Sequence, residues 1–541
     1  MGCGAWRVSR LAFGNSRPGL VPGKRRHFRL NFGSTSRPDV GHLPRWRCLV
    51  KRTPARRKPR TARAKKLATN CCSSDAVPLG PVSVMLDSNV ITQLNVLEDP
   101  LTLKRGLKSL RGCGVTSIAI NVWWGVVENN APGVYEWDTY RTPFRLIKDF
   151  GFEIKAILCF HGNGKISLPS WVLEEGIANP NVFFTDKTGE VYRDCLSLGV
   201  DCVPALRGRT GVGVYADFMA SFLNEFSNIM GSCITEVVVG LGPDGELKYP
   251  SHPKDARWRC PGIGEFQSYD CYMQSTLKAC AERSGHWDWG VQGGPLDAGD
   301  YTSEPEESSF FNAEGGWKSP YGKFFLQWYA SQLLRHGHLV LDSAVRLFSH
   351  HHVTVGAKIP MIHWWQNQPS HPPELTAGIY HTTDRDGYVP ILSMLSEMGV
   401  SIHVSGGELS NASQPENFDS NPEATLAHLR ACAAAFRVPF TIQNLTVMDE
   451  KASWDRIRKL MFEEDSCGSI SLPQISSLMI NYLCDEALHP TFWDEFRSFL
   501  LEVNGKCSTD WDESDGEGSF NRCPSSLSLS EDFCREPFCV T

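Results

Sequence analysis

Short apolar runs recur along the chain between residues 81 and 482 and alternate with amphipathic stretches. The runs are nearly continuous, as in strands of a parallel sheet that is covered on both faces. Eight such strands are expected at 81–86, 117–123, 154–160, 234–241, 353–359, 400–405, 439–443 and 476–482. Helical periodicity lies between or after them at 101–112, 214–229, 322–348, 423–436 and 490–502. Eight strands in alternation with helices predict an α/β fold closed into a (β/α)8, or TIM, barrel.

Two intervals, 161–233 and 242–352, are too long for simple connections. They are rich in Gly, Pro, Trp and Tyr, and each follows a predicted strand. Loops that follow strands extend from the C-terminal face of such a barrel, where active sites are built. We therefore expect long, structured loops on that face, around a deep pocket lined with aromatic residues. The 16 tryptophans fit either stacking on sugar rings or the filling of a large core.

Charge is divided unevenly along the 541 residues. The first 70 hold 19 Lys and Arg against the single acidic residue Asp39, whereas the rest of the chain has a net charge of −24. An Arg- and Ser-bearing N-terminus almost without acidic residues is typical of an organelle transit peptide. The segment 51–58 (KRTPARRK) also fits a nuclear localisation signal or a nucleic-acid-binding arm. We expect a transit peptide over 1–70, a linker over 71–80, the barrel over 81–504, and a disordered acidic, Ser-rich tail over 505–541.

The composition argues against several partners and cofactors. An acidic body repels a phosphate backbone, so we expect no nucleic-acid partner. The leader has no apolar run long enough for a signal-peptide core or a membrane helix, so we expect no membrane partner. The 19 cysteines show no framework spacing and are expected as mostly free thiols in a reducing organelle. His350-His351-His352 is expected in an exposed loop or at a strand edge, and we expect neither a metal site nor a cofactor.

Glu246 is the first candidate for chemistry. It follows the fourth predicted strand within 239–250 (VGLGPDGELKYP), where a turn of Gly and Pro would hold its carboxyl at the C-terminal face. A carboxyl in that position is suited to general-acid catalysis. By its spacing alone, the same residue also fits an exposed loop glutamate.

Six segments, in this order along the chain, resemble signatures of the β-amylase family. They are 121–128 (NVWWGVVE), 196–201 (LSLGVD), 239–250 (VGLGPDGELKYP), 261–269 (PGIGEFQSY), 362–365 (IHWW) and 374–378 (ELTAG). The resemblance covers roughly residues 81–500. It implies an eight-stranded barrel with long loops on one face. It also implies the family's reaction, the inverting release of maltose from the non-reducing ends of α-1,4-glucans.

Inversion requires two carboxyl groups about 6.5–9.5 Å apart, one to protonate the leaving oxygen and one to activate a water. The resemblance places Glu246 at the position of the acid. It places Gln443, within 440–445 (FTIQNL), at the position of the base glutamate, because Asn444 keeps the motif in register. An amide has no basic form near neutral pH, and loss of a general base costs about 10²–10⁴-fold in rate. The resemblance therefore implies a barrel with no or negligible hydrolytic activity.

Other positions depart from the family's pattern. The loop 161–169 corresponds to the family's mobile lid, which covers the substrate, but it is about seven residues shorter. Leu94 and Asn121 stand where the family has aspartates. No arginine lies between Arg458 and Arg497, where the family has one near the last strand. These departures imply a weaker substrate site as well as a missing base.

Several positions that contact sugar in the family carry suitable residues here. The residues expected to bind substrate are His161, Lys358, His363, Trp364, Ser405 and Asn444. Trp365 also fits this set, although one tryptophan of the 364–365 pair is expected to serve packing alone. Glu408 aligns with a family glutamate outside the catalytic pair, so we do not expect it to replace the base.

These observations lead to one main hypothesis and two alternatives. The main one is a noncatalytic β-amylase homologue of the chloroplast stroma. It would act in regulation by binding α-1,4-glucan (maltodextrin) or a partner enzyme of starch metabolism. The first alternative is a functional but slow maltose-releasing hydrolase. The second is a nuclear regulator with a β-amylase-like body and a DNA-binding leader. The leader's prolines argue against such a module, and so does the lack of a basic helix followed by an amphipathic pair of helices.

Overall fold

The computed structural model describes residues 81–252, 262–446, 448, 451–462, 466–467, 470–471, 475–481 and 490–503. The predicted transit peptide, linker and acidic tail lie outside these residues and stay predictions. Nearly all of the predicted barrel segment lies within them.

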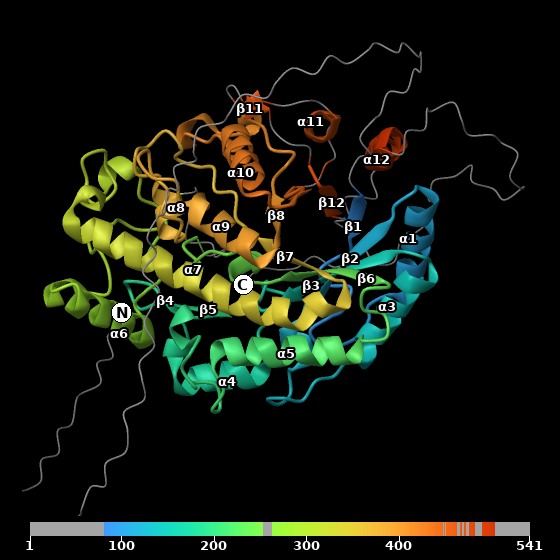
Figure 1. Cartoon of the computed structure of the whole chain (residues 1–541), viewed down its shortest axis with the longest axis horizontal. Coiled ribbons are helices and arrows are strands. Elements are labelled where there is room, and N and C mark those ends of the chain that lie inside the picture. The colour runs from blue at the N-terminus through green and yellow to red at the C-terminus, as the bar shows by residue number, and fades with distance from the viewer. Residues whose placement is uncertain are drawn as a thin grey trace, which may run out of the picture. The chain divides into compact units, whose positions relative to one another are not determined.

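Eight parallel strands close into a barrel in the order β1-β12-β9-β8-β7-β6-β3-β2 (Figure 1). The strands are β1 (Val82–Met85), β2 (Ser117–Trp123), β3 (Glu153–Cys159), β6 (Ile234–Val239), β7 (Thr354–Lys358), β8 (Ser401–Ser405), β9 (Phe440–Gln443) and β12 (Ser477–Asn481). Each coincides with a predicted strand to within two residues at either end. The predicted (β/α)8 barrel is therefore confirmed.

A helix follows each barrel strand, and these helices form a ring around the sheet (Figure 1). They are α1 (Pro100–Gly112), α3 (Asp138–Asp149), α5 (Gly211–Glu225), α7 (Pro320–Phe348), α9 (Tyr388–Met398), α10 (Pro422–Phe436), α11 (Lys451–Phe462) and α12 (Pro490–Val503). Three of them, α1, α7 and α10, begin at a proline that follows the capping residue Asp99, Ser319 or Asn421. This order is favourable because the cap accepts from free backbone N–H groups and proline needs no partner at the first position.

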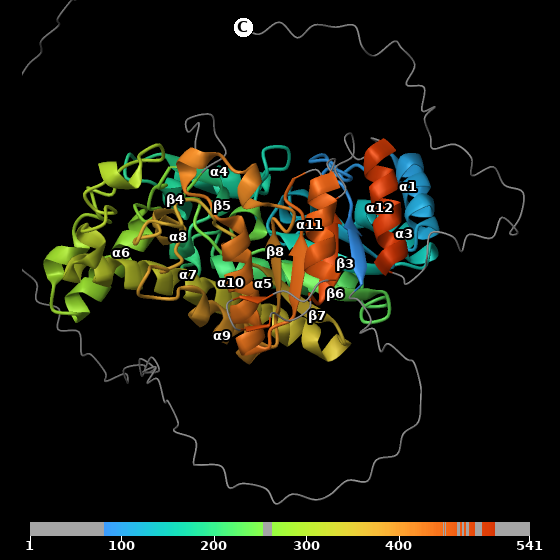
Figure 2. The same ribbon diagram turned by 90° about the horizontal axis from the view of Figure 1, so that it is seen from above.

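Smaller elements lie in the loops that follow the strands and, for the pair β10 and β11, between α11 and β12. They are α2 (Trp124–Val127), α4 (Ser170–Ala178), α6 (Cys271–Arg283), α8 (Pro372–Thr376), the antiparallel pair β4 (Phe183–Thr185) and β5 (Val191–Leu196), and the pair β10 (Ser466–Cys467) and β11 (Ile470–Ser471). In two perpendicular views, α4, α6, α8 and the β4–β5 pair gather at one side of the barrel (Figures 1 and 2). The described parts of 161–233 and 242–352 carry helices and strands, as their composition predicts.

A buried polar network fills part of the barrel interior. Glu236 on β6 contacts Lys155 on β3 at 3.1 Å and His403 on β8 at 2.7 Å. Burial would raise the pKa of Glu236, but His403 and then Lys155 hold it well below its usual range. The contact with His403 passes over β7 at Gly356, where a Cβ would lie only 2.8 Å from the His403 ring. The network therefore depends on a glycine in the intervening strand.

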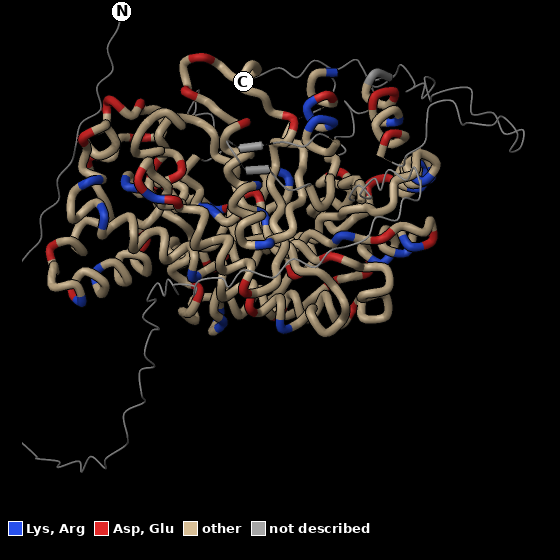
Figure 3. The backbone as a smooth tube through the Cα atoms, turned by 45° about the horizontal axis from the view of Figure 1, so that its top comes forward, with Lys and Arg blue, Asp and Glu red and all other residues tan. Residues whose placement is uncertain are grey.

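Charged positions of both signs are intermingled over the outer helices (Figure 3). Within the described residues, no helix combines the length and the apolar character that a membrane crossing requires.

Candidate active site

Glu246 lies at the C-terminal face, directly after a tight turn that ends β6. The turn is a short 3-10 helix, Pro243–Gly245, in which Asp244 and Gly245 have left-handed φ values of 58° and 80°. The Gly245 amide donates to the Gly242 carbonyl at 2.9 Å, and the Glu246 amide donates to that of Pro243 at 3.0 Å. A Cβ at Gly242 would lie 2.7 Å from two carbonyl oxygens, so the glycine there is required by close packing. The predicted turn of Gly and Pro thus fixes the carboxyl in place.

The Glu246 carboxylate is paired with Lys248, whose Nζ lies 2.7 Å away. The same Nζ lies 3.0 Å from Asp244. Burial would lower the pKa of Lys248, but the carboxylates of Glu246 and Asp244 raise it above its usual value. Lys248 therefore stays charged and orients the candidate acid. It stands within the quoted motif, two residues after Glu246, although the sequence alone did not single it out.

Two predicted substrate-binding residues, Lys358 and His161, lie beside this turn. Lys358 ends β7, its carbonyl accepts from the Leu247 amide at 3.0 Å, and it pairs with Glu246 in a β-bridge. His161 follows β3, is buried, and packs edge-on against Trp123 at a centroid distance of 5.4 Å. The side chains of Lys358 and His161 both approach Gly245, where a Cβ would lie within 3.6 Å of each. The structure thus brings Glu246, Lys358 and His161 together.

Gln443 ends β9 and is 2% exposed. Its amide Nε2 donates to Oδ1 of Asn481, the last residue of β12, and lies 3.8 Å from the sulfur of Met85. Its Oε1 is buried and has no hydrogen-bond partner among the described residues. Gln443 is therefore held as a donor toward Asn481, with one free acceptor oxygen at the end of the strand.

Asn481 links Gln443 to the loop that follows β9. Its amide Nδ2 donates to the Asn444 carbonyl at 2.6 Å, and its backbone N–H donates to Asn444 Oδ1 at 2.7 Å. Asn444 Nδ2 donates in turn to the Thr446 carbonyl at 2.9 Å. The side chain of Asn444, predicted to bind substrate, is thus engaged within the protein at both ends. Asn481 belongs to the predicted last strand, but nothing in its local sequence marked it as a site residue.

The two candidate catalytic positions lie at one face, next to strands that are two apart in the barrel. Glu246 is aligned with β7 through Lys358, Gln443 belongs to β9, and β8 lies between them. Ser405, at the end of β8, pairs with Gln443 in the strand register. Neighbouring strands lie about 4.8 Å apart, so β7 and β9 are about 10 Å apart along the sheet. The two residues therefore lie at the same face of the barrel, on either side of the end of β8.

His363 and Trp364 lie in the loop after β7. The His363 Nδ1 is 2.7 Å from the hydroxyl of Ser420, and burial lowers the pKa of this histidine to about 4, so it is neutral at physiological pH. The Trp364 ring is half-buried, with its centroid 4.8 Å from that of His363. Trp365 is buried and packs against Phe418. Of the two tryptophans, Trp364 keeps the accessible face, while Trp365 serves packing.

The loop 161–169 is a closed turn anchored to its surroundings. Asn163 Oδ1 accepts from the Ile166 amide at 2.7 Å, and Gln93 Oε1 accepts from the Ser167 amide at 2.7 Å. Ile166 is buried, whereas Leu94, next to Gln93, is 84% exposed. An apolar side chain directed into water supplies no hydrogen bond to a sugar.

Glu408 is buried and already holds a neighbouring loop. Its Oε1 accepts from the backbone amides of Leu445 and Thr446 at 2.9 and 2.6 Å, and from the Thr446 hydroxyl at 2.8 Å. Its Oε2 is buried and has no hydrogen-bond partner among the described residues. Glu408 thus holds the loop after β9 through one oxygen, and the expectation that it does not replace the base stays a prediction.

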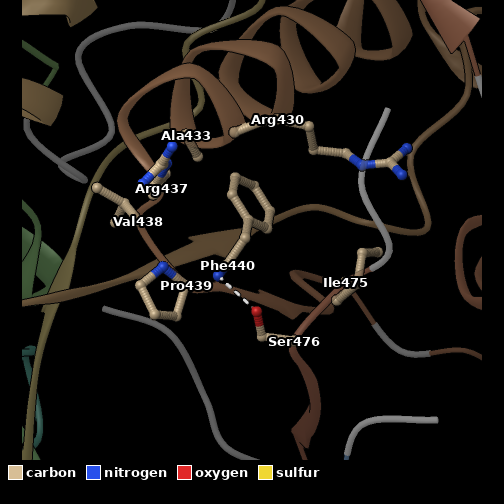
Figure 4. Close-up of a pocket in the computed structure, with 9 residues that line it drawn as sticks. Arg430, Ala433, Arg437, Val438, Pro439, Phe440, Ile475 and Ser476 are labelled. Carbon is tan, nitrogen blue, oxygen red and sulfur yellow. Dashed lines mark hydrogen bonds between the residues drawn. The ribbon is translucent and has the colours of Figure 1, made fainter. Parts of the chain in front are cut away.

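A separate cavity lies at the opposite end of β9. It is bordered by Arg430, Arg437 and Phe440, and the Phe440 amide donates to the Ser476 hydroxyl at 3.0 Å (Figure 4). Phe440 begins β9, whereas Gln443 ends it. Active sites of such barrels lie at the C-terminal ends of the strands, so this cavity is not the candidate site.

Comparisons with known proteins agree with this geometry. The model of glycosyl hydrolase family 14 matches residues 83–497. The chain is 36% identical to a β-amylase of Medicago sativa over 434 residues, which cover 78% of this chain and 87% of the relative. It is 42% identical to the chloroplastic β-amylase 1 of Arabidopsis thaliana over 373 residues, covering 67% and 65%. The solved catalytic domain of a Paenibacillus polymyxa β-amylase superposes with a TM-score of 0.64 at 25% identity, covering 78% of this chain and 98% of that one.

Proposed function

The chain belongs to glycosyl hydrolase family 14, the β-amylase family, and from that premise we propose that it is a noncatalytic homologue that acts in starch metabolism by binding. Membership of the family implies binding of α-1,4-glucan. The proposed regulatory role is to engage glucan, or an enzyme that acts on it, without releasing maltose at a useful rate.

Gln443 carries this proposal. The amide stands where the family has its base glutamate, and it cannot accept a proton from water near neutral pH. Its Nε2 is also committed to Asn481, so only Oε1 is left to meet a water or a sugar hydroxyl. Oε1 can orient a water, but it cannot activate one. The expected loss of rate is at least the 10²–10⁴-fold typical of a missing general base.

Glucan binding is supported by the residues around Glu246. Lys358, His161 and Glu246 offer charged and polar groups, and the half-buried Trp364 offers an aromatic face beside the neutral His363. The exposed Leu94 and the short loop 161–169 offer fewer contacts to a sugar than the corresponding positions of the family's pattern. We therefore expect binding that is weaker than in active relatives.

A plastid location is part of the proposal. The relatives include chloroplastic β-amylases of Arabidopsis thaliana and of rice, at 42% and 36% identity. The basic, acid-poor segment 1–70 is typical of an organelle transit peptide. Expression of the full chain with a C-terminal fluorescent tag tests this: stromal fluorescence supports the proposal, and nuclear fluorescence contradicts it.

A slow hydrolase is the second candidate function. It is favoured by the many relatives whose name is β-amylase and by the retained acid position, Glu246. In this case another group, or a water chain, would have to take the proton that Gln443 cannot take.

Maltose release from soluble starch by residues 71–541 separates the two candidates. The matched control is Glu246→Gln, which removes the acid and keeps the shape of the side chain. The noncatalytic proposal expects the parent to match this control and both to bind maltoheptaose in calorimetry. Release by the parent that Glu246→Gln abolishes would contradict it and establish a hydrolase with a different base.

A further inference from the structure

A group of potential metal ligands lies outside the candidate active site, where the loop after β7 meets α10. It contains His381 and Asp386, which precede α9, and His428 on α10, and Cys432 on α10 contacts both Asp386 and His428. The ligand atoms of His381, Asp386 and His428 lie within 4.8 Å of one another. Cys432 is a free cysteine with 9% exposure. No step of the proposed glucan binding uses these residues.

Three ligand atoms form a nearly equilateral triangle. Asp386 Oδ2 lies 3.2 Å from His428 Nε2 and 3.5 Å from Cys432 Sγ, and these last two atoms are 3.6 Å apart. A tetrahedral Zn²⁺ with ordinary bond lengths separates nitrogen from oxygen by about 3.3 Å and sulfur from either by about 3.5–3.6 Å. The three observed distances agree with this geometry without any movement of the side chains.

Local structure directs all three groups to one point. His428 and Cys432 are four residues apart on α10, so they lie on the same face of the helix. Asp386 Oδ1 accepts from the Tyr388 amide at 2.9 Å, which leaves Oδ2 directed at His428 and Cys432. A carboxylate held through one oxygen in this way is the usual support for a ligating oxygen.

A further layer of polar groups surrounds the triangle. The His381 ring centroid is 5.4 Å from that of His428 and 4.8 Å from that of His371. His371 Nδ1 is 2.8 Å from Glu374 Oε2, and Tyr388 donates to Glu374 Oε1 at 2.6 Å. His381 Nδ1 accepts from the Gly387 amide at 3.2 Å, so this ring would have to turn to reach the metal. Water is the simpler fourth ligand.

We propose that Asp386, His428 and Cys432 form a site for one Zn²⁺ ion, or for a similar divalent transition metal. One thiolate, one imidazole and one carboxylate are the ligand types that Zn²⁺ takes in proteins. Binding releases one proton from the Cys432 thiol and one from the His428 imidazolium, and the metal takes their place. Asp386 and His428 remain 31% and 39% exposed as side chains, so an ion has a path from solvent.

The alternative to a metal is a hydrogen-bonded ion pair. The hydrogen bond to Asp386, and then that to Cys432, raises the pKa of His428 to about 10, so without a metal this histidine is protonated beside the carboxylate. That pair alone would account for the short contact between Asp386 and His428. Hydrogen bonds from or to the thiol also account for the position of Cys432, so metal titration is the measurement that separates the ion pair from a metal site.

A bound ion would join two loops of the candidate active site. Asp386 ends the loop that carries His363 and Trp364, and His428 and Cys432 belong to the helix that follows the loop after β8. These loops already meet where the Asn421 amide donates to the His363 carbonyl at 2.8 Å. The proposed ion therefore has a structural role, and the inference stands whether or not the barrel hydrolyses glucan.

The sequence alone predicted no metal site, because its only obvious cluster was His350-His351-His352. The proposed ligands are spread from residue 386 to residue 432 and come together only through the packing of α9 against α10. Local ligand spacing could not reveal them.

Cobalt substitution of the full chain, freed of metal by dialysis against a chelator, tests the site. One equivalent of Co²⁺ should produce a near-ultraviolet thiolate-to-metal band, and Zn²⁺ should abolish that band stoichiometrically. Cys432→Ser and His428→Gln should each remove the band and weaken Zn²⁺ binding at least about tenfold, as loss of a ligand requires. Cys202→Ser, at an exposed cysteine elsewhere, and His350→Gln with His351→Gln are the matched controls and should leave both unchanged.

Thermal unfolding with and without Zn²⁺ keeps the test valid if a variant is unstable. Zn²⁺ should raise the Tm of the parent and of the controls, but not that of Cys432→Ser. Absence of a thiolate band in the folded parent overturns the proposal and leaves the ion pair. Zn²⁺ binding that persists in both Cys432→Ser and His428→Gln also overturns the proposal. Loss of Zn²⁺ binding in the variant with His350→Gln and His351→Gln would place the ion at those histidines instead.

Discussion

The substitution Gln443→Glu restores a carboxylate at the end of β9, but it meets an acceptor there. In the parent, Gln443 Nε2 donates to Asn481 Oδ1. An ionised carboxylate cannot donate, so two oxygens would face each other in a site where residue 443 is 2% exposed. The Asn481 amide can turn to present its Nδ2, but it then loses its 2.6 Å bond to the Asn444 carbonyl.

The loss of stability depends on whether Asn481 keeps its orientation, which leaves an acceptor unsatisfied, or turns its amide, which exchanges one hydrogen bond for another. An unsatisfied buried acceptor costs about 1–3 kcal/mol, and exchange of one hydrogen bond for another costs about 0.5–1.5 kcal/mol. We therefore expect the variant to lose about 1–3 kcal/mol of stability, which lowers the Tm by about 1–3 °C in a barrel of this size. Burial also raises the pKa of the introduced carboxyl. The loss is thus full above its folded pKa and vanishes below the unfolded pKa of about 4.3, where the protonated group can donate to Asn481.

The assay joins thermal unfolding with maltose release. Gln443→Glu should be less stable than the parent at pH 8 and equal to it near pH 4, and it should release maltose at least about 10²-fold faster if the pocket is otherwise sound. Gln443→Met, which has neither donor nor acceptor, is the control and should show no gain in rate. Equal Tm values for parent and Gln443→Glu at pH 8 would refute the acceptor conflict. A parent that hydrolyses starch as fast as Gln443→Glu would refute the assignment of the base position.

Four further outcomes are expected. Lys155→Met removes one partner of the buried Glu236 and should lower the free energy of unfolding by about 3–5 kcal/mol at pH 7, measured with denaturant. Because the pKa of Glu236 is depressed, the difference in free energy of unfolding between the parent and Lys155→Met should shrink as the pH falls below about 4.3. A difference that stays constant with pH would contradict this prediction. Glu408→Ala should destabilise the loop after β9 by about 1–3 kcal/mol and leave maltose release at the parent's level. If the parent releases maltose and the variant does not, Glu408 acts as the base. Gly245→Ala forces a residue with a side chain to φ 80° and should cost about 1–2 kcal/mol, seen as a lower Tm. The control Gly164→Ala, at φ 84° in open space, has the same backbone strain and should lose as much stability, so only weaker glucan binding by Gly245→Ala, whose Cβ meets His161 and Lys358, should separate the two. Lys358→Met should weaken maltoheptaose binding by about 1.5–3 kcal/mol in calorimetry, and unchanged affinity would exclude Lys358 from the glucan site.

Much of the candidate site could be predicted because its signals are local. Glu246 is held by glycines and a proline adjacent to it in the chain, and Gln443 is placed by the register of its own short motif. The partners that decide how these groups behave are of two kinds. Lys248 is local and could have been identified from its motif, whereas Asn481 comes from another strand and could not.

The sequence by itself determined the barrel and its order of strands and helices, because apolar periodicity and turn residues act over a few neighbouring positions. The two candidate catalytic positions, Glu246 and Gln443, were predicted from short motifs that resemble those of the family. Only the tertiary structure decided that Gln443 is a donor to Asn481, that Glu408 holds a loop, and that Asp386, His428 and Cys432 meet. Such contacts join residues far apart in the chain. Their distances are set by closure of the sheet and by packing between helices, which no local pattern records.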